Sequence, residues 1–61
     1  MAEKIWFGVY DLYPEAGPVL KGRFDKEADA LEYVELLNRK YPSRKYALLR
    51  WDEHGWDFVP V

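Results

Sequence analysis

A single amphipathic stretch, residues 25–41, constrains the fold of this chain more than any other part of its sequence. Wound at about 100° per residue, its apolar side chains fall on one stripe, away from most of its acids and bases. Asp25 can accept hydrogen bonds from free N–H groups of the first turn, and Pro42 disfavours helical geometry at Tyr41. The stripe consists of Ala30, Leu31, Tyr33, Val34, Leu37 and Tyr41. The sequence therefore predicts one helix whose apolar face needs a sheet to cover.

Two segments before this helix and two after it have the composition of β-strands. Residues 4–12 and 19–24 predict a hairpin, because β-branched and aromatic residues are frequent in them and the segment between them contains two prolines and a glycine. After the helix, residues 45–52 predict a third strand. Residues 56–59 predict a short fourth strand, which Pro60 confines to an edge or an end.

This order of elements predicts an α+β fold over residues 1–61, a two-layer ββαβ(β) domain. One amphipathic helix packs on one face of a small, mainly antiparallel sheet of three to four strands. Period-two alternation predicts that the strand side chains facing the helix are Ile5, Phe7, Val9, Leu20, Phe24, Leu49 and Trp51. Because a shift of one residue inverts a strand, we expect at least one inversion.

The composition favours a folded, cytoplasmic protein. A chain of 61 residues buries only about 60% of its unfolded surface, so self-association would help its marginal core. The absence of cysteine fits a reducing compartment, and the N-terminal residues have neither a basic region nor a long apolar run. We therefore expect no signal peptide and no membrane span. A net charge of −2 gives no global attraction to nucleic acid or anionic lipid.

One helix cannot cover both faces of such a sheet, so one face is expected to stay open. The predicted open face carries Trp6, Tyr10, Lys21, Arg23, Tyr46, Leu48 and Arg50. Aromatic residues and arginine are enriched at the centres of protein interfaces. The pattern predicts a binding or regulatory module that contacts a protein partner or forms a homodimer. Alternatively, Trp6 and Tyr10 lie against neighbouring cationic stems or under the C-terminal segment.

A basic cluster near the helix C-terminus supports an alternative, single-stranded nucleic-acid binding. Bases stack on aromatic rings while lysine and arginine follow the phosphates. The net charge and the acidic first half of the helix oppose this interpretation, and bases at a helix C-terminus are favoured by the helix dipole in any case. The cluster consists of Arg39, Lys40, Arg44 and Lys45.

The inventory of reactive side chains predicts no enzyme. His54 is the only histidine, Ser43 is the only serine, and threonine and cysteine are absent. Asp52, Glu53 and Asp57 lie near His54 and could hold a divalent metal, but turn-forming roles are favoured because they occupy a short turn after a strand. No cofactor, metal or small-molecule substrate is predicted.

Three large apolar residues lie outside the helix stripe and the two predicted sheet faces. Trp56 and Phe58 are expected to close one edge of the core, or alternatively to anchor a partner, and Leu36 is expected to lie off the helix stripe. The second strand is the candidate edge for strand addition by another chain. The layout is similar to that of several small bacterial and phage regulatory proteins that act by binding a larger enzyme. This similarity of architecture implies a binding role.

Overall fold

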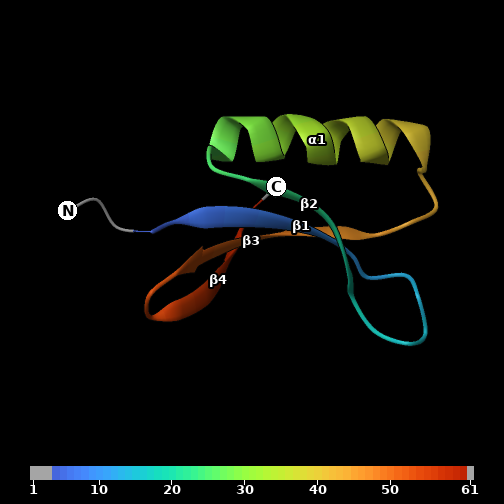
Figure 1. The fold of residues 1–61 in the computed structure, drawn as a ribbon. Helices are drawn as coiled ribbons and strands as arrows, with labels where there is room; N and C mark the ends of the chain where they lie inside the picture. The colour runs from blue at the N-terminus through green and yellow to red at the C-terminus, as the bar shows by residue number, and fades with distance from the viewer. Residues whose placement is uncertain (1–3, 61) are drawn as a thin grey trace.

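The computed structural model describes residues 4–60 and shows one helix packed on one face of a four-stranded antiparallel sheet (Figure 1). The elements are β1 (Trp6–Asp11), β2 (Val19–Phe24), α1 (Glu27–Lys40), β3 (Tyr46–Asp52) and β4 (Gly55–Val59). The strand order is β2-β1-β3-β4, so β2 and β4 form the two edges. The α+β prediction is confirmed. Within residues 4–60, no helix is long and apolar enough to cross a lipid bilayer.

Helix α1 is shorter at both ends than predicted. It begins after Lys26, whose side chain makes no capping hydrogen bond, so the predicted cap at Asp25 is wrong. The main-chain N–H of Ala30 donates to the Lys26 carbonyl, which places the first turn too far along the chain for a cap at Asp25. At the other end, Tyr41 leaves helical geometry before Pro42, as predicted, and its N–H donates to the Leu37 carbonyl.

The core lies between α1 and the centre of the sheet. Its buried members are Phe7, Val9, Ala30, Val34, Leu37 and Leu48. Partly buried side chains packed around them are Ile5, Phe24, Leu31, Tyr33, Tyr46 and Val59. The helix stripe is therefore confirmed except for Tyr41, which is 44% exposed because it follows the last helical turn. Leu36 is exposed, as predicted.

Strand β3 is inverted relative to the prediction. Residues directly opposite each other in antiparallel strands share a face, and Leu48 lies opposite Val9 while Arg50 lies opposite Phe7. Val9 and Phe7 belong to the core, so Tyr46, Leu48 and Arg50 face the helix and the residues between them face away. Apolar residues occupy both sets of alternate positions in this strand, so alternation alone did not determine which set faces the helix.

Strand β2 contains a bulge at Lys21. Its pairing with β1 passes from Val9–Gly22 to Tyr10–Leu20, which leaves Lys21 as an extra residue. Leu20 therefore shares the face of Tyr10, away from the helix, and the prediction that it joins the core is wrong. Lys21 lines a cavity on the helix side of the sheet, so its predicted place on the open face is also wrong.

The inversion of β3 predicts unequal effects for two adjacent leucines. We expect Leu48→Ala to lower the free energy of unfolding by about 2–5 kcal/mol, because it leaves a void in the core. Leu49→Ala, the matched control, should cost about 1 kcal/mol or less, because Leu49 faces away from the helix. Urea denaturation monitored by circular dichroism measures both values. A larger loss for Leu49→Ala would contradict this orientation.

Candidate functional site

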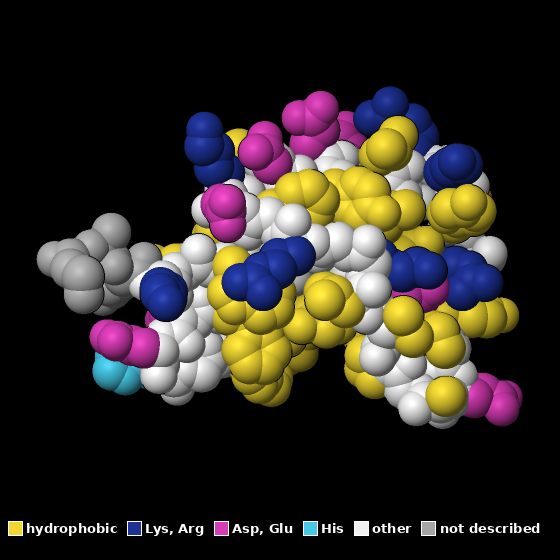
Figure 2. Space-filling view, viewed as in Figure 1, with side chains coloured by type: hydrophobic (Ala, Val, Ile, Leu, Met, Phe, Trp, Pro, Cys, Tyr) yellow, Lys and Arg dark blue, Asp and Glu magenta, His cyan; other side chains and the backbone are white. Residues whose placement is uncertain are grey.

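The face of the sheet opposite α1 carries large apolar side chains, and hydrophobic side chains project below the level of the sheet in Figure 2. We define the open aromatic face as Trp6, Tyr10, Leu49, Trp51, Trp56 and Phe58. Trp56 is 50% exposed and Phe58 is 66% exposed. The prediction that these two residues close the core is therefore wrong, because their register places them opposite Trp51 and Leu49 on the uncovered face.

The seven residues predicted for this face divide between the two sides of the sheet. Trp6, Tyr10 and Arg23 lie on the open side, since Arg23 is opposite Gly8 and contacts the Trp6 ring. The other four lie on the helix side, which corrects their predicted placement: Lys21, Tyr46, Leu48 and Arg50. The bulge in β2 moves the first, and the inversion of β3 moves the remaining three.

Cross-strand pairing arranges aromatic rings from β1, β3 and β4 in a ladder, which the Arg23 side chain extends onto β2. The Arg23 guanidinium carbon lies 4.4 Å from the centroid of the Trp6 ring. Trp6 stacks on Trp51 with centroids 5.4 Å apart and planes within 3°. Trp51 is followed by Trp56 at 6.3 Å, and Trp56 meets Phe58 edge-on at 5.2 Å. Each step is an offset or tilted contact of the kind that aromatic rings favour.

Contacts within the open aromatic face already cover the Trp6 ring and satisfy the indole N–H of Trp51. Arg23 and Trp51 come from strands on opposite sides of β1, so the Trp6 ring lies between a guanidinium and an indole. The indole N–H of Trp51 donates to the Tyr10 hydroxyl at 3.1 Å. A ring stacked on both sides offers little room for a nucleobase, and a satisfied indole N–H can be removed from water at low cost.

Gly8 explains why the rings of β1 lie down over the sheet. A Cβ atom at Gly8 would come within 2.7 Å of Tyr10 Cε1 and 2.9 Å of Trp6 Cζ3. The two rings therefore lean over this glycine from its two sides, which no larger residue would allow without a shift. Beside them is a groove of about 270 Å³, lined by Tyr10, Leu12, Pro18, Leu49, Trp51, Trp56 and Phe58.

A larger hollow of about 450 Å³ lies along α1 beside Phe24 of β2 and Tyr33. Its lining includes three acids, and its one base, Arg39, already pairs with Glu35 at 3.0 Å. Size alone therefore does not select a site. We favour the smaller groove because it is continuous with the exposed rings of the ladder and because its lining is almost wholly apolar.

The predicted basic cluster is partly used in holding the fold together. Arg44 Nη1 lies 2.9 Å from Asp11 Oδ2, and its guanidinium also lies over the Tyr13 ring at 5.1 Å. Asp11 is only 2% exposed and accepts a second hydrogen bond from the Tyr13 main-chain N–H. Partial burial, and then this nearby carboxylate, raise the pKa of Tyr46 above its ordinary value. Asp11 was not among the predicted site residues, although its position in phase with Phe7 and Val9 indicated that it lies on the core side of β1.

Removing the Arg44 side chain should therefore affect stability. We expect Arg44→Ala to lower the free energy of unfolding by about 1–3 kcal/mol, because Asp11 keeps its burial and loses its ion pair; the 41% exposure of Arg44 limits the loss. Lys45→Ala, at the neighbouring exposed position, should change it by about 0.5 kcal/mol or less. Urea denaturation at neutral pH measures both. Equal effects of the two variants would show that the Asp11 contact contributes nothing.

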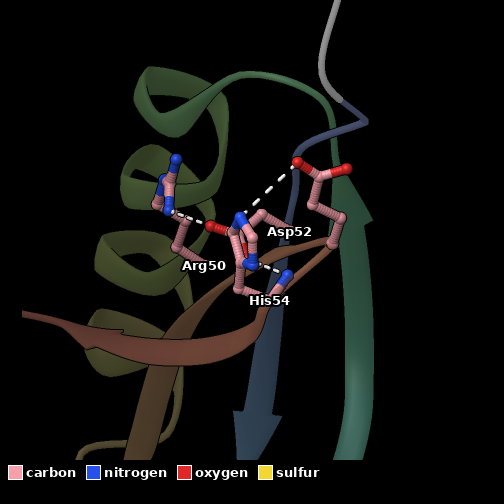
Figure 3. Close-up of polar contacts among 4 residues, drawn as sticks. Arg50, Asp52 and His54 are labelled. Atoms are coloured by element: carbon pink, nitrogen blue, oxygen red, sulfur yellow. Dashed lines mark hydrogen bonds and ion pairs between the residues drawn. The ribbon is translucent and has the colours of Figure 1, made fainter.

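The acids beside His54 form a turn between β3 and β4 (Figure 3). Asp52 accepts a hydrogen bond from the His54 main-chain N–H at 2.8 Å and another from Arg50 Nη1 at 2.8 Å. These contacts hold the pKa of Asp52 below its ordinary value, the His54 N–H contributing most and partial burial opposing it. Gly55 completes the turn with a φ of +120°, a conformation that favours glycine.

Other contacts at this turn are weak. The His54 Nε2 and Glu53 Oε1 atoms are 3.5 Å apart on two strongly exposed side chains. Across residues 4–60, no group of three or more histidine, cysteine, aspartate or glutamate side chains is placed to hold a metal ion. Asp52 therefore supports the turn through the His54 N–H and pairs with Arg50 within β3.

The lowered pKa of Asp52 predicts a pH dependence of stability. An ionised group with a lower pKa in the folded chain stabilises the fold above its unfolded pKa, about 3.9, and this contribution is lost as the pH falls through the folded pKa. Asp52→Asn should therefore lower the urea midpoint at neutral pH, and the difference from the wild type should vanish in acid. Urea titrations from neutral to acidic pH test this. A difference independent of pH would rule out a contribution from the charge.

Comparison of the chain with protein-family models, with curated proteins and with solved structures gives no match. The geometry of the open aromatic face and the contacts around it are therefore the evidence for a function.

Proposed function

We propose that this chain is a small non-enzymatic binding module that acts through protein contact on the open aromatic face. The observation that carries the proposal is the aromatic ladder of β1, β3 and β4, which Arg23 extends onto β2, on the side of the sheet that α1 leaves uncovered. An exposed apolar surface of this extent costs free energy in water unless another surface covers it. The lack of cysteine favours the cytoplasm as the place where this contact forms.

The ladder has the chemistry of a protein interface core. Tryptophan, tyrosine and arginine contribute most to measured hot spots, and they do so where their polar atoms are satisfied. Here the Trp51 N–H is bonded to Tyr10, and Arg23 lies against the Trp6 ring. The most exposed members, Trp56 and Phe58, lie on edge strand β4, where an approaching surface can enclose them.

Single-stranded nucleic-acid binding through the basic cluster has weaker support. Arg39 pairs with Glu35 and Arg44 pairs with buried Asp11, so two of the four predicted bases have acidic partners within the chain. Lys40 lies over the Tyr41 ring. Phosphate binding would compete with each of these contacts. Nucleic-acid binding is therefore the alternative function that the experiment must exclude.

The test compares face and control variants of the immobilised chain as bait for cellular proteins. We expect the double variant Trp56→Ala, Phe58→Ala to weaken specific capture by about 30-fold or more, the scale of a single hot spot. Leu36→Ala, which removes an equally exposed leucine from the helix, should leave capture unchanged. Isotope-coded mass spectrometry quantifies the bound proteins.

Two results would contradict the proposal. One is capture that the double variant and the Leu36→Ala control reduce equally. The other is binding of a single-stranded oligonucleotide that falls steeply with added salt, is lost on Lys40→Glu, Lys45→Glu, and is unaffected by the changes at Trp56 and Phe58.

A further inference from the structure

We infer that the partner is an extended segment of another protein, which adds to the sheet beside β4 as a further antiparallel strand and places a basic residue opposite Asp57. The inference rests on the proposed function and names the kind of partner and the way in which it docks. The added segment bonds to the main chain of β4, and its apolar side chains lie beside Trp56 and Phe58 on the open aromatic face.

The outer edge of β4 is uncovered. Among the described elements, β4 contacts β3 alone, and helix α1 contacts only the other three strands. The pairing of β4 with β3 runs from Gly55 to Val59 without a bulge. The main-chain groups along this edge are therefore regularly spaced, which is the arrangement that another strand requires for pairing.

The opposite edge of the sheet is protected against strand addition. In β2, the bulge at Lys21 interrupts the pairing with β1 and increases the local twist. A bulge and a lysine are two of the devices by which natural edge strands resist pairing with another chain. We therefore place strand addition on β4 instead of β2, the edge that the sequence predicted.

The hydrogen-bonding pattern of the sheet identifies the outward main-chain groups of β4. The Leu12 N–H donates to the Lys45 carbonyl, so the hydrogen-bonded pairs of β1 with β3 recur at every second position from there. The remaining residues of β3 bond to the residues of β4 that lie opposite them. The N–H and C=O groups of Trp56 and Phe58 therefore point away from β3, and they offer two donors and two acceptors to an added strand.

The charge of Asp57 selects the residue that the partner places opposite it. Asp57 lies opposite Arg50, whose guanidinium is bonded to Asp52 at 2.8 Å. Within residues 4–60, Asp57 forms no ion pair, so one base here faces two acids. In an antiparallel added strand, the position opposite Asp57 belongs to a non-hydrogen-bonded pair, in which the side chains approach most closely. A lysine or arginine at that position forms an ion pair with Asp57.

The same carboxylate opposes a second copy of this chain as the added strand. Two antiparallel β4 strands use all the outward main-chain groups only when Trp56 of one copy lies opposite Phe58 of the other. That register sets Asp57 opposite Asp57, and like charges at directly opposed positions destabilise a strand pair. A shift in one direction brings Pro60, which has no N–H, to a bonding position, and a shift in the other brings the turn residue His54 there. The added strand therefore comes from a different protein.

These constraints define a sequence pattern for the partner. The residues on the two sides of its base lie opposite Trp56 and Phe58, and their side chains extend toward the open aromatic face. Apolar residues at these two positions pack against the exposed rings. The partner segment is therefore extended and carries an apolar–basic–apolar triplet in which both apolar residues have an N–H group.

The first experiment uses the end-blocked peptide Ser-Thr-Val-Lys-Val-Thr-Ser as the probe and follows the amide resonances of the isotope-labelled chain. We expect saturable binding at millimolar peptide or below, with slower solvent exchange of the Trp56 and Phe58 N–H groups, because each donates to a peptide carbonyl. N-methylation of both valines removes their N–H donors and keeps their side chains, and it should abolish binding. Equal binding of the N-methylated peptide would place the peptide on the aromatic face alone and overturn the inference.

The second experiment tests the register by exchanging charges. Replacing the peptide lysine with glutamate should weaken binding to the wild type about fivefold or more, and Asp57→Lys should reverse this preference. Glu53→Lys, which changes the charge equally at the exposed turn, is the matched control and should keep the preference for lysine. Circular dichroism verifies that each variant is folded. An equal loss of preference in both variants would indicate a long-range charge effect and overturn the position assigned to the base.

The remaining outcomes separate this inference from the proposed function. If neither the lysine peptide nor the glutamate peptide binds, the inference is overturned, while the proposed function stands as long as capture of cellular proteins still depends on Trp56 and Phe58. If the lysine peptide binds at the edge but capture does not depend on these two residues, strand addition stands and the proposed role of the aromatic face fails. If neither result is obtained, both proposals fail.

Discussion

The rest of the structure depends on one constraint of coverage, because a single helix of this length can cover only one face of a four-stranded sheet. Helix α1 contacts β1, β2 and β3 on one side. The buried core is therefore assembled from one helix stripe and the alternate residues of these strands. The opposite side of the sheet has no second layer within residues 4–60, and there large aromatic residues stand in place of the polar side chains that alternation usually puts on an exposed face.

Charge is distributed between the two sides of the sheet in a way that preserves the apolar character of the open side. Asp11 is buried on the helix side and neutralised by Arg44, which the loop after α1 brings to it. Asp52 is held by Arg50 and by the main chain of the turn. On the open side, Arg23 and the Trp51 N–H both have partners within the face. Covering this side with another surface therefore leaves few polar groups unsatisfied.

Much of the fold could be predicted from local sequence patterns. The helix, the hairpin before it and both strands after it were predicted within two residues of their observed bounds, because periodicity and turn residues act over short distances. The open aromatic face was predicted less well: Trp6, Tyr10 and Arg23 were placed on the correct side of the sheet, whereas Leu48 lies in the core and Trp56 lies on the face. In β3, both sets of alternate residues are apolar enough to be buried, so the pattern itself was ambiguous.

The sequence by itself determined the type and order of the elements, and it determined that one sheet face would stay uncovered, because a single amphipathic stripe is available to cover it. Only the tertiary structure decided which residues occupy that face. The pairing of β1 with β3 sets the side on which Leu48 and Trp51 lie, and the bulge at Lys21 turns Leu20 outward. Both are contacts between segments far apart in the chain, whose register follows from packing of the whole core and has no signal in the local pattern of either segment.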